Sequence, residues 1–201
     1  MLKSDQLADK LENKSGASNP LVIVPTPDLE HLRTSGSASV DLRLGCWFIT
    51  SRLSRVTCLD VRSSDEANVL RTTRTVYVPF GQDYILHPRN FVLGATLEWI
   101  NIPNDLAGYV TARSSWGRRG LVIATAVGVH PGFTGCLTLE LTNLGEVPIA
   151  IQPGMGVCQL FLHLANSDSP AIDRSKFVGY RRPMLRPISD DPITAKLSKF
   201  L

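Results

Sequence analysis

Short apolar runs, separated by turn residues, make up most of the chain beyond residue 20. The runs are rich in Val, Ile, Leu and Thr, and β-branched residues favour extended backbone. They predict strands at residues 40–49, 75–78, 85–86, 91–100, 108–112, 121–126, 136–142, 149–151 and 157–164. Turn sequences lie between them, at 103–105, 131–132, 143–145 and 152–154. Many short strands with few helices are typical of a β-barrel or a β-sandwich.

The ends of the chain and one internal stretch depart from this pattern. Near the N-terminus, Ser4 can cap a helix on which Leu7 and Leu11 share a face. Residues 51–74 are polar and mixed in charge, so they predict a long excursion loop or a small exposed hairpin. We expect a single domain over residues 1–201, with an N-terminal helix in 1–19, the polar excursion at 51–74 and a C-terminal tail at 166–201.

The composition is that of an ordinary globular protein. The 201 residues suffice to bury a core, and 43% of them are hydrophobic and 19% charged. The N-terminus lacks the apolar run of a signal peptide, and no stretch approaches the roughly 20 apolar residues of a membrane span. None of the four cysteines belongs to a CxxC pair, which disfavours a zinc knuckle. We therefore expect a cytoplasmic protein with reduced thiols and no membrane partner.

Positive charge is concentrated in two parts of the sequence, although the formal net charge is only +3. Between Asp105 and Glu140 the chain carries three arginines, one histidine and no acid. Between Asp173 and Asp190 it carries four arginines, one lysine and no acid. Such local fields suit a polyanion such as a triphosphate, or else belong to a solvated basic surface. A nucleic-acid partner is disfavoured, because these stretches lack a basic strand studded with aromatic residues that stack bases.

The run RSSWGRRG at residues 113–120 joins two predicted strands. Its glycines let backbone N–H groups approach a ligand, and its arginines offer planar forks for phosphate oxygens. It is not a Walker A loop, because the GK[ST] ending is missing. The run predicts a phosphate-binding loop, with a plain surface turn as the alternative.

The sequence CLTLELT at residues 136–142 alternates strictly, so Thr138 and Glu140 face away from the leucines. Glu140 is the first acid after a long acid-free stretch, and its small neighbours on that face leave room for a ligand. It is a candidate functional carboxylate, with an outward-facing strand residue as the alternative. His130 in the preceding turn and Gln159 after the turn at 152–154 are candidate ligand contacts, or serve only the turn and the backbone.

In their order along the chain, these segments resemble the dCTP deaminase branch of the trimeric dUTPase-like superfamily. The matching segments are SVDLRLG at 39–45, RSS at 113–115 with Arg118 and Gly120-Leu121, PGFTG at 131–135 followed by Leu139-Glu140 and Asn143, PGM at 153–155 with Gln159-Leu160, and SKF at 175–177 with Gly179. The resemblance implies a mainly β fold, a distorted dUTPase-like β-barrel of the β-clip type, and a homotrimer with active sites between subunits. It also implies zinc-independent hydrolysis of dCTP to dUTP and ammonia. The sequence contains neither the HxE nor the PCxxC that zinc deaminases need.

The same resemblance implies a role for each site residue. Glu140 would be the general base and proton shuttle, served by Ser114, Arg118 and the backbone carbonyl of Ala126. Arg113, Ser115 and Lys176 would hold the phosphates, with Mg²⁺ bound through the nucleotide triphosphate. Further nucleotide contacts would come from Trp116, Gly117, His130, Thr138, Leu139, Gln159 and Tyr180. A further expectation is feedback by dTTP.

Two of the candidate site residues are among the positions that depart from the family pattern. His130 stands where these enzymes and the dUTPases usually carry Asp, and Tyr180 stands where a Gln is usual in the tail. That Asp is central to hydrolysis in dUTPases, so His130 argues against a dUTP pyrophosphatase or a bifunctional deaminase-pyrophosphatase, which is the alternative activity. A non-catalytic deoxynucleotide-binding sensor that kept the phosphate loop is the third interpretation.

Overall fold

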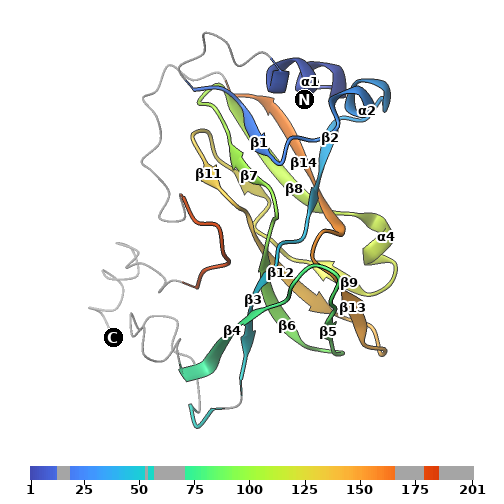
Figure 1. Cartoon of the computed structure of the whole chain (residues 1–201), viewed down its shortest axis with the longest axis vertical. Coiled ribbons are helices and arrows are strands. Elements are labelled where there is room, and N and C mark those ends of the chain that lie inside the picture. Colours follow the sequence, from blue (N-terminus) through green and yellow to red (C-terminus); the bar gives the residue numbers. More distant parts are fainter. Residues whose placement is uncertain (13–18, 53, 57–70, 166–178, 186–201) are drawn as a thin grey trace, which may run out of the picture.

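The computed structural model describes residues 1–12, 19–52, 54–56, 71–165 and 179–185. The helices among them are α1 (Ser4–Glu12), α2 (Leu29–Thr34) and α4 (Ser114–Gly117). The strands are β1 (Val22–Val24), β2 (Ser39–Arg43), β3 (Trp47–Ser51), β4 (Thr73–Tyr77), β5 (Tyr84–Leu86), β6 (Phe91–Ala95), β7 (Trp99–Asn101), β8 (Leu106–Ala112), β9 (Leu121–Ile123), β10 (Gly128–Val129), β11 (Thr134–Gly135), β12 (Thr138–Asn143), β13 (Ile149–Ile151) and β14 (Gly156–Leu164). The predicted mainly β fold is confirmed (Figure 1).

The strands pair antiparallel in separate sheets (Figure 1). The two larger sheets have the orders β4-β3-β6-β12-β9 and β10-β8-β14-β2, and the smaller ones β1-β7-β11 and β13-β5. Within the described residues these sheets do not close into one barrel, so the barrel expected from the sequence is a set of adjoining sheets. Helices α1 and α2 lie together at one end of the molecule, and α4 projects at its side (Figure 1).

Two predicted strands are each divided between sheets. The stretch 40–49 becomes β2 and β3, because Gly45 donates its N–H to the Ala95 carbonyl at 2.8 Å and interrupts the strand. The stretch 91–100 becomes β6 and β7, because the Thr96 hydroxyl donates to the Glu98 carbonyl at 2.8 Å and bends the chain. Hydrophobic alternation continues through such a bend, so the sequence pattern does not reveal it.

The N-terminal helix is confirmed, and it packs on a second helix that the pattern did not predict. Helix α1 buries Leu7 and Leu11 in the core. The unpredicted helix α2 begins where the Asp28 side chain accepts the His31 N–H at 3.0 Å. Its Arg33 forms ion pairs with two acids of α1. Strand β1 was also missed, since three residues are too few for a periodic signal.

The polar excursion at 51–74 begins and ends on paired strands. Ser51 of β3 lies opposite Thr73 of β4, and residues 53 and 57–70 between them are outside the described part of the chain.

No helix of the described residues is long and apolar enough to cross a membrane.

Candidate functional site

The 113–120 loop connects β8 with β9, as predicted, and folds as the single helical turn α4. The Trp116 N–H donates to the Arg113 carbonyl at 3.0 Å, which closes the turn. The Trp116 indole donates to the Gly156 carbonyl at 2.7 Å, which fastens the turn to β14. The residues that this arrangement leaves exposed are Ser114, Ser115, Gly117, Arg118 and Arg119. A bound anion would therefore meet hydroxyl and guanidinium groups on the outer side of a braced turn.

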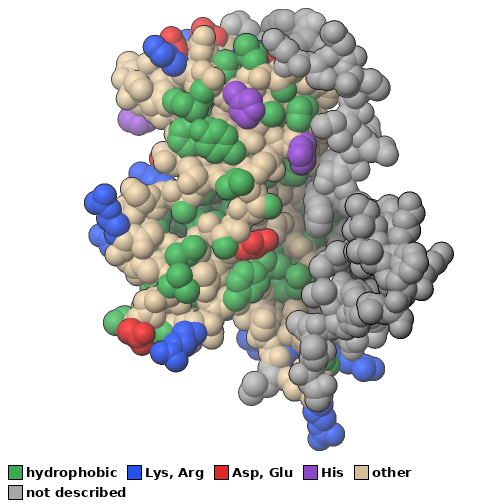
Figure 2. Space-filling model, turned by 180° about the vertical axis from the view of Figure 1, so that it is seen from behind, with side chains coloured by type: hydrophobic (Ala, Val, Ile, Leu, Met, Phe, Trp, Pro, Cys, Tyr) green, Lys and Arg blue, Asp and Glu red, His purple; other side chains and the backbone are tan. Residues whose placement is uncertain are grey.

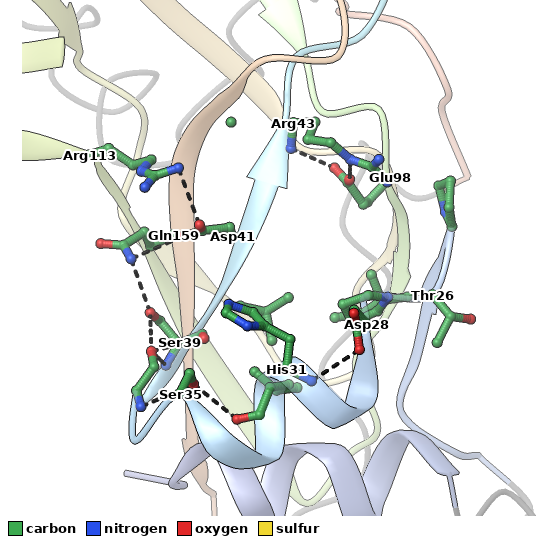
Figure 3. A pocket seen from close by; sticks show the side chains of 17 residues that line it. Thr26, Asp28, His31, Ser35, Ser39, Asp41, Arg43, Glu98, Arg113 and Gln159 are labelled. Atoms are coloured by element: carbon green, nitrogen blue, oxygen red, sulfur yellow. Dashed lines mark hydrogen bonds and ion pairs between the residues drawn. The ribbon is translucent and has the colours of Figure 1, made fainter. Parts of the chain in front are cut away.

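Arg113 points away from the exposed side of the loop and pairs with an acid from a distant strand. Its Nη1 lies 3.2 Å from Asp41 Oδ2, and Gln159 Nε2 donates to Asp41 Oδ1 at 3.1 Å (Figure 3). A Cβ at Gly156 would lie 2.9 Å from Arg113 Nη1, so the absence of a side chain there makes room for the guanidinium. Two predicted ligand residues thus meet at the carboxylate of Asp41, which the sequence pattern does not mark as part of a site.

Arg113 and Gln159 form one edge of a cavity of about 580 Å³, with α2 on the other side (Figure 3). Glu98 also lines this cavity; it is only 2% exposed and accepts the backbone N–H and the Nε of Arg43, at 2.7 and 2.6 Å. Each guanidinium in the wall therefore has its own carboxylate, Arg43 with Glu98 and Arg113 with Asp41. A phosphate that binds Arg113 from this cavity would have to compete with Asp41.

Glu140 lies on β12 and faces away from the core, as the alternation predicts. The neighbouring Leu139 and Leu141 are fully buried, whereas Glu140 is half-buried. Its backbone carbonyl accepts the Ala124 N–H at 2.8 Å, and its N–H donates to the Thr125 hydroxyl at 3.1 Å. On its other side β12 pairs with β6, with Glu140 opposite Leu93. Contacts on both sides therefore fix the backbone from which the Glu140 side chain extends.

The predicted site residues divide into two groups within one chain. The loop group is Arg113, Ser114, Ser115, Trp116, Gly117, Arg118 and Gln159, and the strand group is Ala126, His130, Thr138, Leu139 and Glu140. Among the described residues, no hydrogen bond or ion pair joins the Glu140 side chain to Ser114 or Arg118. The cavity beside Arg113 does not include Glu140. In the described part of the chain the two groups are therefore not linked by a hydrogen bond or an ion pair.

The remaining predicted residues differ in what they can offer a ligand. Ala126 and His130 are exposed, so the Ala126 carbonyl and the imidazole are accessible. The Leu139 side chain is fully buried, so only its backbone can face a nucleotide. The Tyr180 backbone carbonyl accepts the N–H of Cys136, which lies two residues before β12. Lys176 lies outside the described residues.

Sequence reasoning assigned no role to three polar residues beside these groups. Asp41 stands on the polar side of a predicted strand, but nothing in the sequence names Arg113 as its partner. The Thr125 hydroxyl accepts the Glu140 N–H, but a single threonine in a predicted strand gives no sequence signal that would mark such a contact. Of the three, only Glu98 could have been predicted from the sequence, because a single acid inside an apolar run indicates a buried and paired charge.

Comparison with known proteins gives one consistent family. A family model described as dCTP deaminase-like matches residues 2–165. A dCTP deaminase from Halorubrum lacusprofundi is 41% identical over 184 residues, covering 88% of this chain and 87% of the relative. A dUMP-forming dCTP deaminase from Methanobrevibacter smithii is 37% identical over 155 residues, which is 77% of each chain. Among solved structures, the 2'-deoxycytidine 5'-triphosphate deaminase from Agrobacterium tumefaciens matches with a TM-score of 0.58 at 20% identity, over 80% of this chain and 45% of that one, which is a likeness of fold.

Proposed function

The chain belongs to the dCTP deaminase-like family, and we propose that it catalyses the hydrolytic deamination of dCTP to dUTP and ammonia. The observation that carries this proposal is Glu140, a half-buried carboxylate whose backbone is held on both sides of its strand. A general base must be positioned within hydrogen-bond reach of its proton, and rigid strands provide such positioning better than loops.

The proposed chemistry consumes one water. Glu140 takes a proton from that water, and the resulting hydroxide adds to C4 of the cytosine ring. The bond between C4 and the exocyclic nitrogen then breaks as C4 becomes a carbonyl. Of the two water protons, one ends on N3 of the ring and the other on the departing ammonia. Glu140 carries both transfers, so no redox partner is needed.

The loop group would bind the rest of the substrate. We assign Arg113 and Ser115 to the phosphates, and Ser114 and Arg118 to the water and the Glu140 carboxylate. Arg113 can exchange Asp41 for a phosphate, because a guanidinium fork suits either anion. We assign Mg²⁺ to the triphosphate, since Mg²⁺ commonly binds through substrate phosphates with at most one or two carboxylates. The further contacts assigned by resemblance are Ala126, Trp116, Gly117, His130, Thr138, Leu139, Gln159, Lys176 and Tyr180.

We further propose a homotrimer in which the loop group of one subunit meets Glu140 of the next. Two observations support this arrangement. Among the described residues, no hydrogen bond or ion pair joins the loop group to Glu140 within one chain. Large apolar side chains are also exposed, and Figure 2 shows apolar side chains gathered across the middle of one face. In such an assembly dTTP would be a feedback ligand of the same sites.

Substitution of the base tests the proposal. Glu140→Gln keeps the size of the side chain but removes its basicity, so kcat for dCTP should fall at least about 100-fold. The measurement is product chromatography and ammonia release with dCTP and Mg²⁺. Glu146→Gln is the matched control, because Glu146 is exposed and its surface ion pair with Arg89, at 3.8 Å, is long and weak. Full activity of the Glu140 variant would refute the role of Glu140.

The same chromatography separates two further candidate functions. One relative is a dUMP-forming enzyme, so dUMP and pyrophosphate would indicate that the chain continues past dUTP. His130, in place of the Asp usual in dUTPases, favours dUTP as the end product. Thermal stabilisation by dCTP or dTTP without turnover would instead indicate a nucleotide sensor.

A further inference from the structure

Residues 179–184 are here called the strap. The strap lies beside residues 134–136, which come just before β12, the strand that carries Glu140. The Gly179 N–H donates to the Thr134 carbonyl at 2.6 Å, and the Cys136 N–H donates to the Tyr180 carbonyl at 2.8 Å. Two backbone hydrogen bonds thus dock the strap beside β11, and it is the dark red segment beside β11 in Figure 1. Both bonds join backbone groups only, so they do not depend on which side chains the strap carries.

Gly135 provides the space into which the strap fits. Its φ is +140°, and a Cβ there would lie 3.1 Å from the Tyr180 carbonyl oxygen and 3.3 Å from the Gly179 nitrogen. Both atoms belong to backbone that is already hydrogen-bonded, so neither can move without loss of a bond. The glycine and the strap therefore fit each other directly.

Arg182 fastens the other end of the strap. Its guanidinium carbon lies 3.8 Å from the centre of the Trp47 ring, and Trp47 in turn packs against Tyr77 at 4.9 Å between ring centres. Trp47 and Tyr77 face each other across β3 and β4, so the ring that receives Arg182 is held by a sheet. A cation over the face of a tryptophan is the strongest form of this contact.

The strap lies close to the proposed catalytic strand. Cys136 precedes Glu140 by four residues, which is about 13 Å along an extended chain. We propose that Arg182 and Trp47 are a positioning pair, which holds the strap against Gly135 and thereby keeps Tyr180 beside the nucleotide face of β12. The effect on nucleotide binding rests on the proposed function, whereas the docking of the strap does not.

The Cys136 thiol reports on docking without any substrate. Cys136 is 8% exposed, burial raises the pKa of its thiol, and its N–H is bonded to the strap. Release of the strap should therefore expose this thiol to iodoacetamide, and peptide mass spectrometry distinguishes it from the other cysteines. In Arg182→Gln and in Trp47→Leu the alkylation rate at Cys136 should rise about 2- to 5-fold, the range expected for loss of one cation–π contact at an exposed arginine.

Control variants separate the effect of the Arg182–Trp47 contact from the effect of removing a positive charge. Arg74→Gln makes the same substitution at an exposed position of β4 and should leave the alkylation rate unchanged. Arg181, whose charge lowers the pKa of Cys136, stays in place in every variant. Arg182→Lys retains a cation and should restore part of the protection. Equal alkylation rates in the wild type, Arg182→Gln and Trp47→Leu would overturn the proposal.

Steady-state kinetics test the positioning role. If the strap positions Tyr180 at the nucleotide, Arg182→Gln should raise KM for dCTP about 2- to 5-fold and change kcat much less, with partial rescue in Arg182→Lys. A faster Cys136 alkylation with an unchanged KM would overturn the positioning role. A wild-type protein without dCTP turnover would refute the proposed function instead, because the alkylation result does not depend on substrate.

Discussion

A buried carboxylate is stable only where hydrogen-bond donors replace its water, and Glu98 meets this condition through one neighbour. Two donors of Arg43 each reach a different oxygen of Glu98, at 2.7 and 2.6 Å. The Leu97 N–H donates back to the Arg43 carbonyl at 2.7 Å. The ion pair thus ties the bend between β6 and β7 to β2, at the wall of the cavity beside Arg113.

Cys158 should make the protein sensitive to alkaline pH. Burial, with the charges of Glu98 and Asp41, raises the pKa of its thiol from 9.0 to about 12. Above pH 9 the unfolded chain loses this proton while the folded chain keeps it. The free energy of unfolding should therefore be unaffected by this group below about pH 9 and fall by up to about 4 kcal/mol as the pH rises to 12. Urea unfolding at several pH values measures the slope.

Cys158→Ala removes the titrating group, so its free energy of unfolding should decline less steeply above pH 9 than that of the wild type. Cys46→Ala is the comparison, because Cys46 is less buried and should contribute a smaller slope. Identical pH slopes for the wild type and Cys158→Ala would show that the alkaline loss has another origin.

At the scale of elements, the proposed phosphate loop is held by the turn that follows β12. The Leu144 N–H donates to the Gly120 carbonyl at 2.8 Å, and the Gly145 N–H donates to the Asn143 side chain at 2.9 Å. Asn143 is itself fully buried, and its side-chain amide donates hydrogen bonds to the backbone carbonyls of Leu86 and Val147. The end of β12 therefore sets the position of the loop.

Gly120→Ala should weaken this connection. Gly120 has a φ of +89°, and a Cβ there would lie 2.8 Å from the Gly145 backbone nitrogen. The left-handed conformation alone should cost about 1–2 kcal/mol in the free energy of unfolding, and the contact with backbone adds to it. Gly117→Ala is the matched control, because it lies in α4 with no atom within 4 Å of the added Cβ, and should be neutral or slightly stabilising. Equal unfolding free energies for the two variants, measured in urea, would contradict this account.

At the scale of the molecule, several large apolar side chains remain in solvent. Val127, Leu144, Val147 and Leu164 are each more than half exposed. Apolar side chains cross the middle of the face in Figure 2, and basic ones lie toward its edges. Closed symmetric oligomers commonly bury such surfaces, which agrees with the proposed trimer.

Mixing two inactive variants tests whether the sites are shared between subunits. Glu140→Gln and Arg118→Gln should each be inactive alone, because each removes one half of the site. If the halves come from neighbouring subunits, a refolded equal mixture should regain about a quarter of the wild-type kcat, since one interface in four combines two intact halves in a ring of three. Activity no higher than that of the separate variants would place both halves in one subunit or refute their roles.

Local properties of the chain were predictable from the sequence alone. The period of two at 136–142 showed that Glu140 faces away from the core, because side-chain direction in a strand depends only on adjacent residues. The glycines and short polar residues of 113–120 predicted a turn between strands, and residues 4–12 form the expected helix. The ordered motifs indicated the family, which the comparisons confirm.

Only the tertiary structure decided how these local pieces meet. Arg113 pairs with Asp41, Arg182 lies on Trp47, and the strands at 40–49 and 91–100 bend into different sheets. Each of these features depends on groups far apart in the sequence, and their energies come from burial and distance that no local pattern contains. The sequence by itself therefore determined the family, the turn at 113–120 and the direction in which Glu140 faces, while the packing of distant strands determined which residues are neighbours within one chain.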